Sequence, residues 1–154
     1  MNELNVSIFG KTVSGRNLLS AASEPGAMLA SDGAGYDLNF RRFGDLVHPR
    51  SFGAYPRFFN LISQKAKISY GETIAKMTSL PAAALGLKDR GILKPKNIAD
   101  IANFHPEEFK DEATYKNSYR YAKGLRFLII SGNLAVSDGL PLPKRCGLTL
   151  RKKI

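Results

Sequence analysis

Only two segments in the first 86 residues have the pattern of a buried parallel β-strand, and this small number limits what the chain can form by itself. Residues 4–9 alternate and contain Val6 and Ile8, and residues 27–30 are a short apolar run that ends at a loop. Between them, Ser14 can cap a helix that runs to about Ala22. This order predicts a βαβ unit with parallel strands. Because a closed barrel takes eight strands and roughly 250 residues, the chain is expected to be either a small unusual fold or a piece of a larger one.

The next stretch is mainly helical. Residues 33–54 are rich in Gly, Asp and Arg with little periodicity, which predicts a long loop, and such loops are usually functional or disordered. Residues 55–66 predict a helix. Ser69 and Glu72 fit a capping box at the start of a second helix, and Gly86 fits the C-cap of a short third one.

After the third helix the pattern changes to short β-type runs. Residues 98–104 are a candidate strand, and the strongly apolar residues 125–130 predict a central strand. Ser131-Gly132-Asn133 predicts a hairpin turn into a strand at residues 134–136. We therefore divide the chain into an α/β part, residues 1–86, and a small β part with a basic tail, residues 87–154.

The charge balance is the one unusual feature of the composition. The 23 Lys and Arg residues against 13 Asp and Glu residues give a net charge of +10, which favours polyanions such as nucleic acid or anionic membrane. The basic residues are scattered, however, and no recognition helix, paired Cys/His spacing or aromatic-basic motif accompanies them. A solvated surface is the simpler interpretation, and a non-enzymatic basic module that binds polyanions is the alternative.

Membrane and secretory segments are not expected in this sequence. No apolar run approaches the roughly 18 residues of a membrane span, and residues 1–9 lack the basic region of a signal peptide. We therefore expect a cytoplasmic protein. Cys146 is the single cysteine, so no internal disulfide can form.

Five groups of residues occur in a fixed order along the chain. They are Ser31-Asp32-Gly33; His48-Pro49-Arg50-Ser51-Phe52-Gly53 with Tyr55-Pro56-Arg57; Met77-Thr78-Ser79-Leu80-Pro81-Ala82; Leu85-Gly86-Leu87-Lys88-Asp89-Arg90-Gly91; and Ala99-Asp100-Ile101. In this order and spacing they resemble the C-terminal third of the N-acyl-D-amino-acid deacylases, or D-aminoacylases, of the amidohydrolase superfamily. Each motif alone is weak evidence for this family, whereas five motifs in the same order and spacing are specific to it.

The resemblance implies a fold that this chain holds only in part. It implies a (β/α)8 barrel with a small β-sandwich, in which residues 4–9 are the seventh barrel strand and residues 27–32 the eighth. The helices at 55–66 and 69–78 follow the eighth strand, and residues 91–136 supply strands of the sandwich. The expected fold class is thus α/β, an incomplete barrel plus part of a sandwich.

The resemblance also implies a reaction. In such barrels the active site lies at the carboxyl ends of the strands, where Asp32 would sit. By resemblance Asp32 is the general acid/base that takes a proton from water and returns it to the leaving amine, and it is a possible metal ligand. The implied substrate is a small N-acyl-D-amino acid, hydrolysed to a carboxylate and a D-amino acid, and the implied cofactor is zinc.

Most of the implied metal site is missing from this sequence. A catalytic zinc usually has three protein ligands, whereas the chain has two distant histidines, His48 and His105, and the tail cysteine Cys146. In the family the histidine ligands lie on earlier strands. We therefore expect the isolated chain to be inactive unless an N-terminal, metal-binding half completes it, for example as a separately encoded chain. A gene remnant without function is the remaining alternative.

Three further residues are candidates for substrate binding. Arg50 has the planar fork that suits a substrate carboxylate, while His48 and Ser51 lie in the same loop, which would cover the active site. Each has a simpler interpretation as an exposed loop residue. Asp32 has one as well, because Asp-Gly is a common turn pair.

Overall fold

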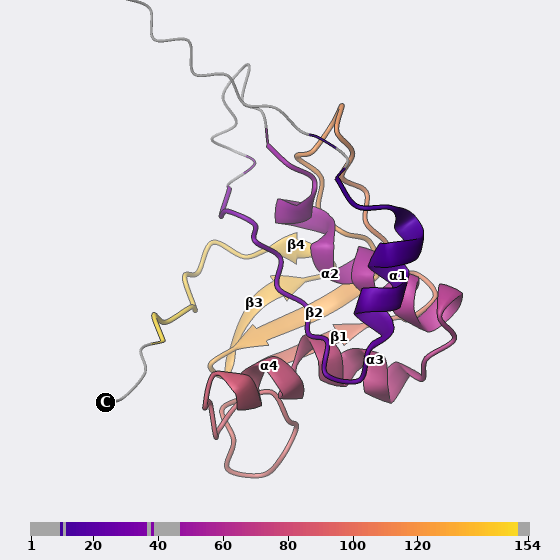
Figure 1. Cartoon of the computed structure of the whole chain (residues 1–154). Helices are drawn as coiled ribbons and strands as arrows, with labels where there is room; N and C mark the ends of the chain where they lie inside the picture. Colours follow the sequence, from indigo (N-terminus) through magenta and orange to yellow (C-terminus); the bar gives the residue numbers. More distant parts are fainter. Residues whose placement is uncertain (1–9, 11, 37, 39–46, 151–154) are drawn as a thin grey trace, which may run out of the picture.

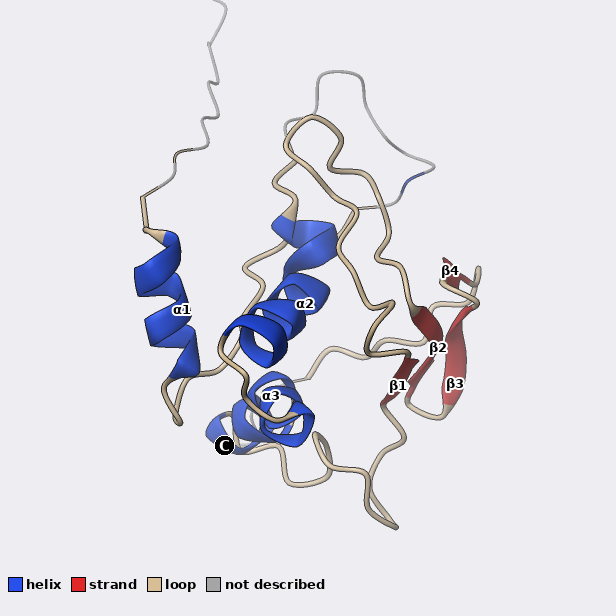
Figure 2. Cartoon of the chain, turned by 90° about the vertical axis from the view of Figure 1, so that its right-hand side faces the viewer, coloured by secondary structure: helices blue, strands red, loops and turns tan. Residues whose placement is uncertain are grey.

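The computed structural model describes residue 10, residues 12–36, residue 38 and residues 47–150. Its helices lie on one side of the molecule and a four-stranded sheet lies on the other (Figure 2). The order along the chain follows the colours of Figure 1: α1 (Gly15–Ser23), α2 (Arg50–Asn60), the π-helical turn η2 (Leu61–Lys65), α3 (Tyr70–Met77), α4 (Ser79–Ala84), β1 (Ile101–Phe104), β2 (Leu125–Ile130), β3 (Asn133–Ser137) and β4 (Leu140–Pro141). None of the helices in these ranges is long and apolar enough to cross a membrane.

Helix α1 begins and ends close to the predicted bounds. The Ser14 hydroxyl accepts a hydrogen bond from the Asn17 amide at 3.2 Å, and this bond satisfies one of the free N–H groups of the first turn. The helix ends at Ser23, just before Pro25-Gly26. The predicted cap and end of this helix are confirmed.

The predicted strand at residues 27–32 is wrong for this structure. These residues have no regular secondary structure, and Met28 is 46% exposed. A strand needs a neighbour to pair its backbone groups, but here the Leu29 amide donates at 3.0 Å to the carbonyl of Lys76 in a helix. No parallel pair of strands, and hence no βαβ unit, occurs in the described ranges. The first predicted strand, residues 4–9, lies outside them.

Helix α2 begins at Arg50, five residues before the predicted start, so the predicted loop at 33–54 is wrong at its end. Proline is favoured in the first turn because it has no N–H to leave unpaired and its φ suits a helix. Accordingly, Pro49 directly precedes the helix, and its carbonyl accepts from the amides of Phe52 and Gly53 at 3.0 and 2.9 Å. The predicted helix at 55–66 is confirmed, and its last turn is the π-helical η2.

The next two helices follow their predicted end signals. The Ser69 hydroxyl accepts from the Glu72 amide at 3.2 Å and caps α3. Beyond α4, Gly86 has a φ of 72°, and the Leu87 amide donates to the carbonyl of Ala82 at 2.8 Å. This left-handed glycine closes the helix as its C-cap, as predicted.

The sheet is antiparallel throughout, with the strand order β1-β2-β3-β4. Strand β2 has the predicted bounds, whereas β1 begins at Ile101 instead of residue 98. Ser131 and Gly132 have φ values of 49° and 77°, which is the type I′ geometry that matches strand twist. The predicted hairpin is therefore confirmed, and the edge strand β4 was not predicted.

An aromatic cluster joins the helices to the sheet. The Phe59 ring, on α2, is 1% exposed, and its centroid lies 5.3 Å from those of Tyr70 and Phe104 and 5.9 Å from that of Phe109. The Asn60 amide group also donates to the Phe109 carbonyl at 2.7 Å. These contacts hold the C-terminal end of α2 against β1 and the segment that follows it. They thereby also position the first turns of α2, where the candidate site lies.

Candidate functional site

A cleft of about 230 Å³ lies where residues 29–31 pass the first turns of α2. Its apolar wall includes Leu18 and Leu61, and its polar groups are those of Ser31, His48, Arg50, Arg57 and Asp111. Two of the residues predicted to bind substrate, His48 and Arg50, therefore line one cavity.

Asp32 does not line this cleft itself but forms an ion pair with Arg50, which does. Its Oδ2 is 2.8 Å from Nη2 of Arg50, and its side chain is 83% exposed. The residue has a φ of 47°, a left-handed conformation in which Asp is several-fold enriched over other side chains. A Cβ on Gly33 would lie 2.9 Å from the Cα of Ser51, so only glycine permits this approach to α2.

His48 holds the start of α2. Its Nδ1 accepts a hydrogen bond from the Arg50 amide at 3.1 Å, and its Nε2 lies 3.3 Å from the hydroxyl of Tyr115. An Nδ1 that accepts leaves the proton on Nε2, so this geometry selects the neutral Nε2–H tautomer. Burial lowers the pKa of His48 below 6.5, and the positive charges of Arg50 and Arg57 lower it further.

Ser51 occupies the first turn of α2. Its amide donates to the His48 carbonyl at 3.0 Å, and its side chain is half-buried. The four residues predicted for the site, Asp32, His48, Arg50 and Ser51, are thus close together in space.

Sequence reasoning missed one ion pair in the cleft. Nε of Arg57 lies 3.3 Å from Oδ2 of Asp111, whose side chain is only 24% exposed. A Cβ on Gly53 would lie 2.7 Å from the Asp111 Cβ, so the segment carrying Asp111 packs directly on α2. Arg57 belongs to one of the quoted motifs, but no local pattern marks Asp111.

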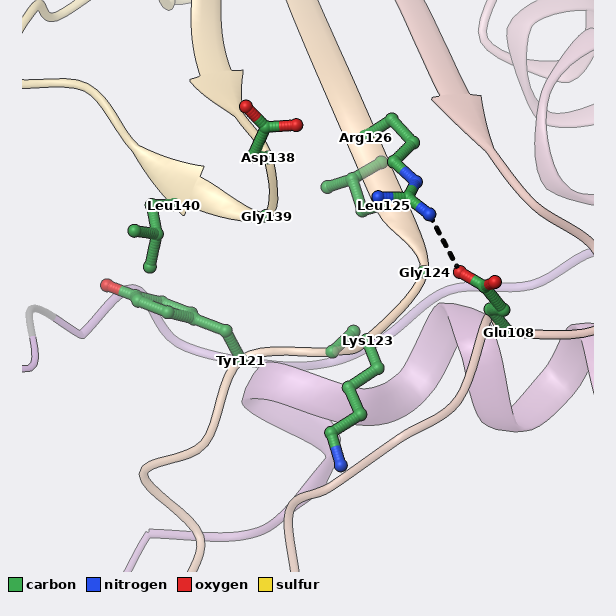
Figure 3. A pocket seen from close by; sticks show the side chains of 10 residues that line it. Glu108, Tyr121, Lys123, Gly124, Leu125, Arg126, Asp138, Gly139 and Leu140 are labelled. Carbon is green, nitrogen blue, oxygen red and sulfur yellow. Dashed lines mark hydrogen bonds and ion pairs between the residues drawn. The ribbon is translucent and has the colours of Figure 1, made fainter.

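A second cleft, of about 290 Å³, lies at the beginning of β2 and is slightly larger (Figure 3). Three of the charged groups that line it are in ion pairs: Arg126 Nη2 lies 3.2 Å from Glu108 Oε2, and Lys123 Nζ lies 3.1 Å from Glu112. None of the predicted site residues lines it. We therefore place the candidate site in the smaller cleft.

The residues that the structure describes do not supply a metal site. No three His, Cys, Asp or Glu side chains within these ranges converge in a way that could hold an ion. His105 follows β1, and Cys146 lies in the tail near the carbonyl of Leu134. Neither belongs to the cleft that holds His48.

Comparisons with known proteins give a consistent result. No family model matches the chain. An N-acyl-D-glutamate deacylase and a D-aminoacylase of Alcaligenes xylosoxydans xylosoxydans are each 32% identical to it, over 81% and 68% of this chain. The chain spans 24% and 20% of these relatives, about a quarter or less of their length.

Two solved structures resemble the fold. A D-aminoacylase, described as defining a novel subset of amidohydrolases, gives a TM-score of 0.75 and 26% identity over 86% of this chain and 27% of that one. The N-acyl-D-glutamate deacylase of Bordetella bronchiseptica, in complex with zinc and a phosphonate inhibitor, gives 0.69 and 26% over 82% of this chain and 26% of that one. The relatives are thus hydrolases of one kind, and zinc is bound to one of them.

Proposed function

Because this chain is a homologue of the N-acyl-D-amino-acid deacylases, we propose that it forms the C-terminal part of such an enzyme and supplies its general acid/base, Asp32. The observation that carries the proposal is that His48 and Arg50 line one cleft, while Asp32 pairs with Arg50 and the Ser51 amide donates to the carbonyl of His48. The substrate class is then an N-acyl-D-amino acid, and the reaction is hydrolysis of its amide bond.

Asp32 has the chemistry for this role. A carboxylate can accept a proton from the attacking water and return it to the nitrogen that leaves. Its ion pair with Arg50 directs the carboxylate toward the start of α2. The residues described here do not group three ligands for the zinc that one relative binds, and we propose that the remainder of the enzyme holds the metal.

Arg50 is the proposed contact for the carboxylate of the substrate. A guanidinium carries five N–H donors, and the bond to Asp32 uses one of them. The Arg50 side chain is 45% exposed, so the other donors remain accessible from the cleft. His48 and the Ser51 hydroxyl are proposed to line the same place, His48 as a neutral imidazole.

We propose that the remainder of the enzyme, in the same polypeptide or in a separate one, completes both the barrel and the β-sandwich. Residues 1–86 would pack into the (β/α)8 barrel, and residues 87–154 would join the β-sandwich. The exposure of Leu18 and Met28, 51% and 46%, supports this arrangement, because a complementary surface would cover them.

A complementation experiment tests the proposed function. The part of the N-acyl-D-glutamate deacylase of Alcaligenes xylosoxydans xylosoxydans that precedes the matching segment is produced with this chain. Hydrolysis of N-acetyl-D-glutamate and N-acetyl-D-methionine is then measured. We expect turnover of a D-substrate by the pair and none by either part.

The Asp32→Asn variant keeps the shape of the side chain but cannot accept the proton. It is expected to lower kcat of the pair at least about a hundredfold, the lower end of the contribution of a general acid/base. The exposed Asp138, in the β3–β4 turn, provides a matched control as Asp138→Asn. An active Asp32→Asn pair would contradict the role of Asp32, and equal hydrolysis of L-substrates would contradict the substrate class.

A further inference from the structure

Helix α3 has a polar buried face. Thr73 and Lys76, one turn apart, are both fully buried, whereas Ile74 between them is 38% exposed. A buried lysine is costly unless hydrogen bonds replace the water that it loses. The chemistry proposed for Asp32 does not involve Lys76, so the burial of this lysine has another cause.

Three backbone carbonyls surround the Lys76 ammonium. Nζ donates to the carbonyl of Glu24 and lies 3.5 Å from the carbonyls of Pro25 and Ala27. An ammonium has three N–H donors, so the number of acceptors matches the number of donors. Within the described ranges no carboxylate lies at ion-pair distance from Lys76, and the contacts of its ammonium there are to main-chain oxygens.

Lys76 contacts residues 24–29 a second time, through its own main-chain carbonyl. The Lys76 carbonyl accepts from the Leu29 amide at 3.0 Å. Three residues further on, Asp32 pairs with Arg50, and Gly33 lies against Ser51. Residues 24–33 are thus held by α3 in their first half and by α2 in their second half, without a strand ladder.

We propose that Lys76 is a positioning residue whose buried cation fixes residues 24–29 and thereby sets the place of Asp32 relative to α2. Lys76 acts through the chain, because its ammonium contacts residues before Asp32 and not Asp32 itself. A catalytic consequence of this positioning rests on the proposed function of Asp32. The contacts of Lys76 and the experiments that test them do not depend on that function.

Amide hydrogen exchange of the intact chain tests the inference. The Lys76→Met variant keeps the length and apolar stem of the side chain but has no donor. We expect the amides of Leu29, Asp32 and Gly33 to exchange about tenfold faster or more, as for the loss of a hydrogen bond from a charged group. The amides of β2 should keep their rates. The exposed Lys88 gives a matched control as Lys88→Met, with no change expected at these amides.

Rescue separates the effect of the cation from the effect of packing. Lys76→Arg retains donors and is expected to slow exchange at residues 29–33 again, relative to Lys76→Met. Unchanged exchange at 29–33 in Lys76→Met would overturn the proposal. Acceleration by the same factor throughout the chain, or no recovery with Arg, would also overturn it, since either would assign Lys76 to general packing.

A second measurement needs no substitution. In the unmodified chain, the ammonium protons of one lysine should exchange with water much more slowly than those of exposed lysines, and selective labelling would assign this signal to Lys76. Uniformly fast exchange of all lysine ammonium groups would overturn the proposal. Because both measurements use exchange alone, an active Asp32→Asn pair would refute the proposed function and leave this inference standing.

Discussion

At the scale of single residues, the pair between Asp32 and Arg50 serves orientation more than stability. An ion pair between exposed side chains typically contributes about 0–1 kcal/mol, because water and salt screen it. The Asp32 side chain is 83% exposed and that of Arg50 is 45% exposed, so this pair belongs to the weak class. The geometry that it imposes on Asp32 is therefore its main consequence.

His48 gives a prediction for pH dependence. Its folded pKa lies below 6.5, first because of burial and then because of Arg50 and Arg57. The unfolded chain therefore binds this proton more readily, and the free energy of unfolding rises with pH between the two pKa values. The contribution of His48 is complete above pH 6.5 and is lost as the pH falls through its folded pKa.

Urea unfolding between pH 5 and 8 measures this contribution. The His48→Asn variant retains an acceptor for the Arg50 amide but does not titrate in this range. We expect a weaker fall in stability toward acid pH for the variant than for the parent chain. Identical pH profiles for the two proteins would refute the assignment.

The residues of the candidate site could be predicted only in part. His48, Arg50 and Ser51 lie within four residues of one another, so one motif identified all three, and the resemblance added Asp32. Asp111 and Tyr115 reach the cleft by tertiary packing, and their surroundings in the sequence are those of an ordinary polar loop. Contacts of this kind leave no local pattern.

At the scale of elements, the caps account for where the helices begin and end. Ser69→Ala removes the hydroxyl that accepts from the Glu72 amide at the start of α3. We expect the free energy of unfolding to fall by about 1 kcal/mol, the usual cost of an N-cap. Ser69→Asp should retain most of the stability, because its carboxylate also accepts. Chemical denaturation checks both, and an unchanged Ser69→Ala would contradict the role of the cap.

The elements differ in how well their sequences determine them. Strand β2 was predicted to the residue because it is mostly apolar, ends in two β-branched residues and is followed by a turn that its strand twist favours. Residues 27–30 have a similar apolar pattern but no strand in the described chain to pair with, so they remain irregular. Periodicity predicts what a segment favours, whereas pairing decides what it forms.

At the scale of the whole molecule, the net charge and the homology favour different functions. The net charge of +10 suggested a polyanion-binding module, but the basic side chains of Arg50, Arg57, Arg90, Arg120, Lys123 and Arg126 are paired with carboxylates. The homology to part of an N-acyl-D-glutamate deacylase is the finding on which the proposed function rests instead.

The central claim is that this chain contributes a catalytic carboxylate and that the remainder of the enzyme contributes the metal. Zinc analysis combined with hydrolysis of N-acetyl-D-methionine, on the purified chain alone and after assembly, tests it most directly. We predict neither zinc nor turnover for the chain alone, and both for the assembly. Stoichiometric zinc with D-specific, Asp32-dependent turnover by the chain alone would contradict the claim.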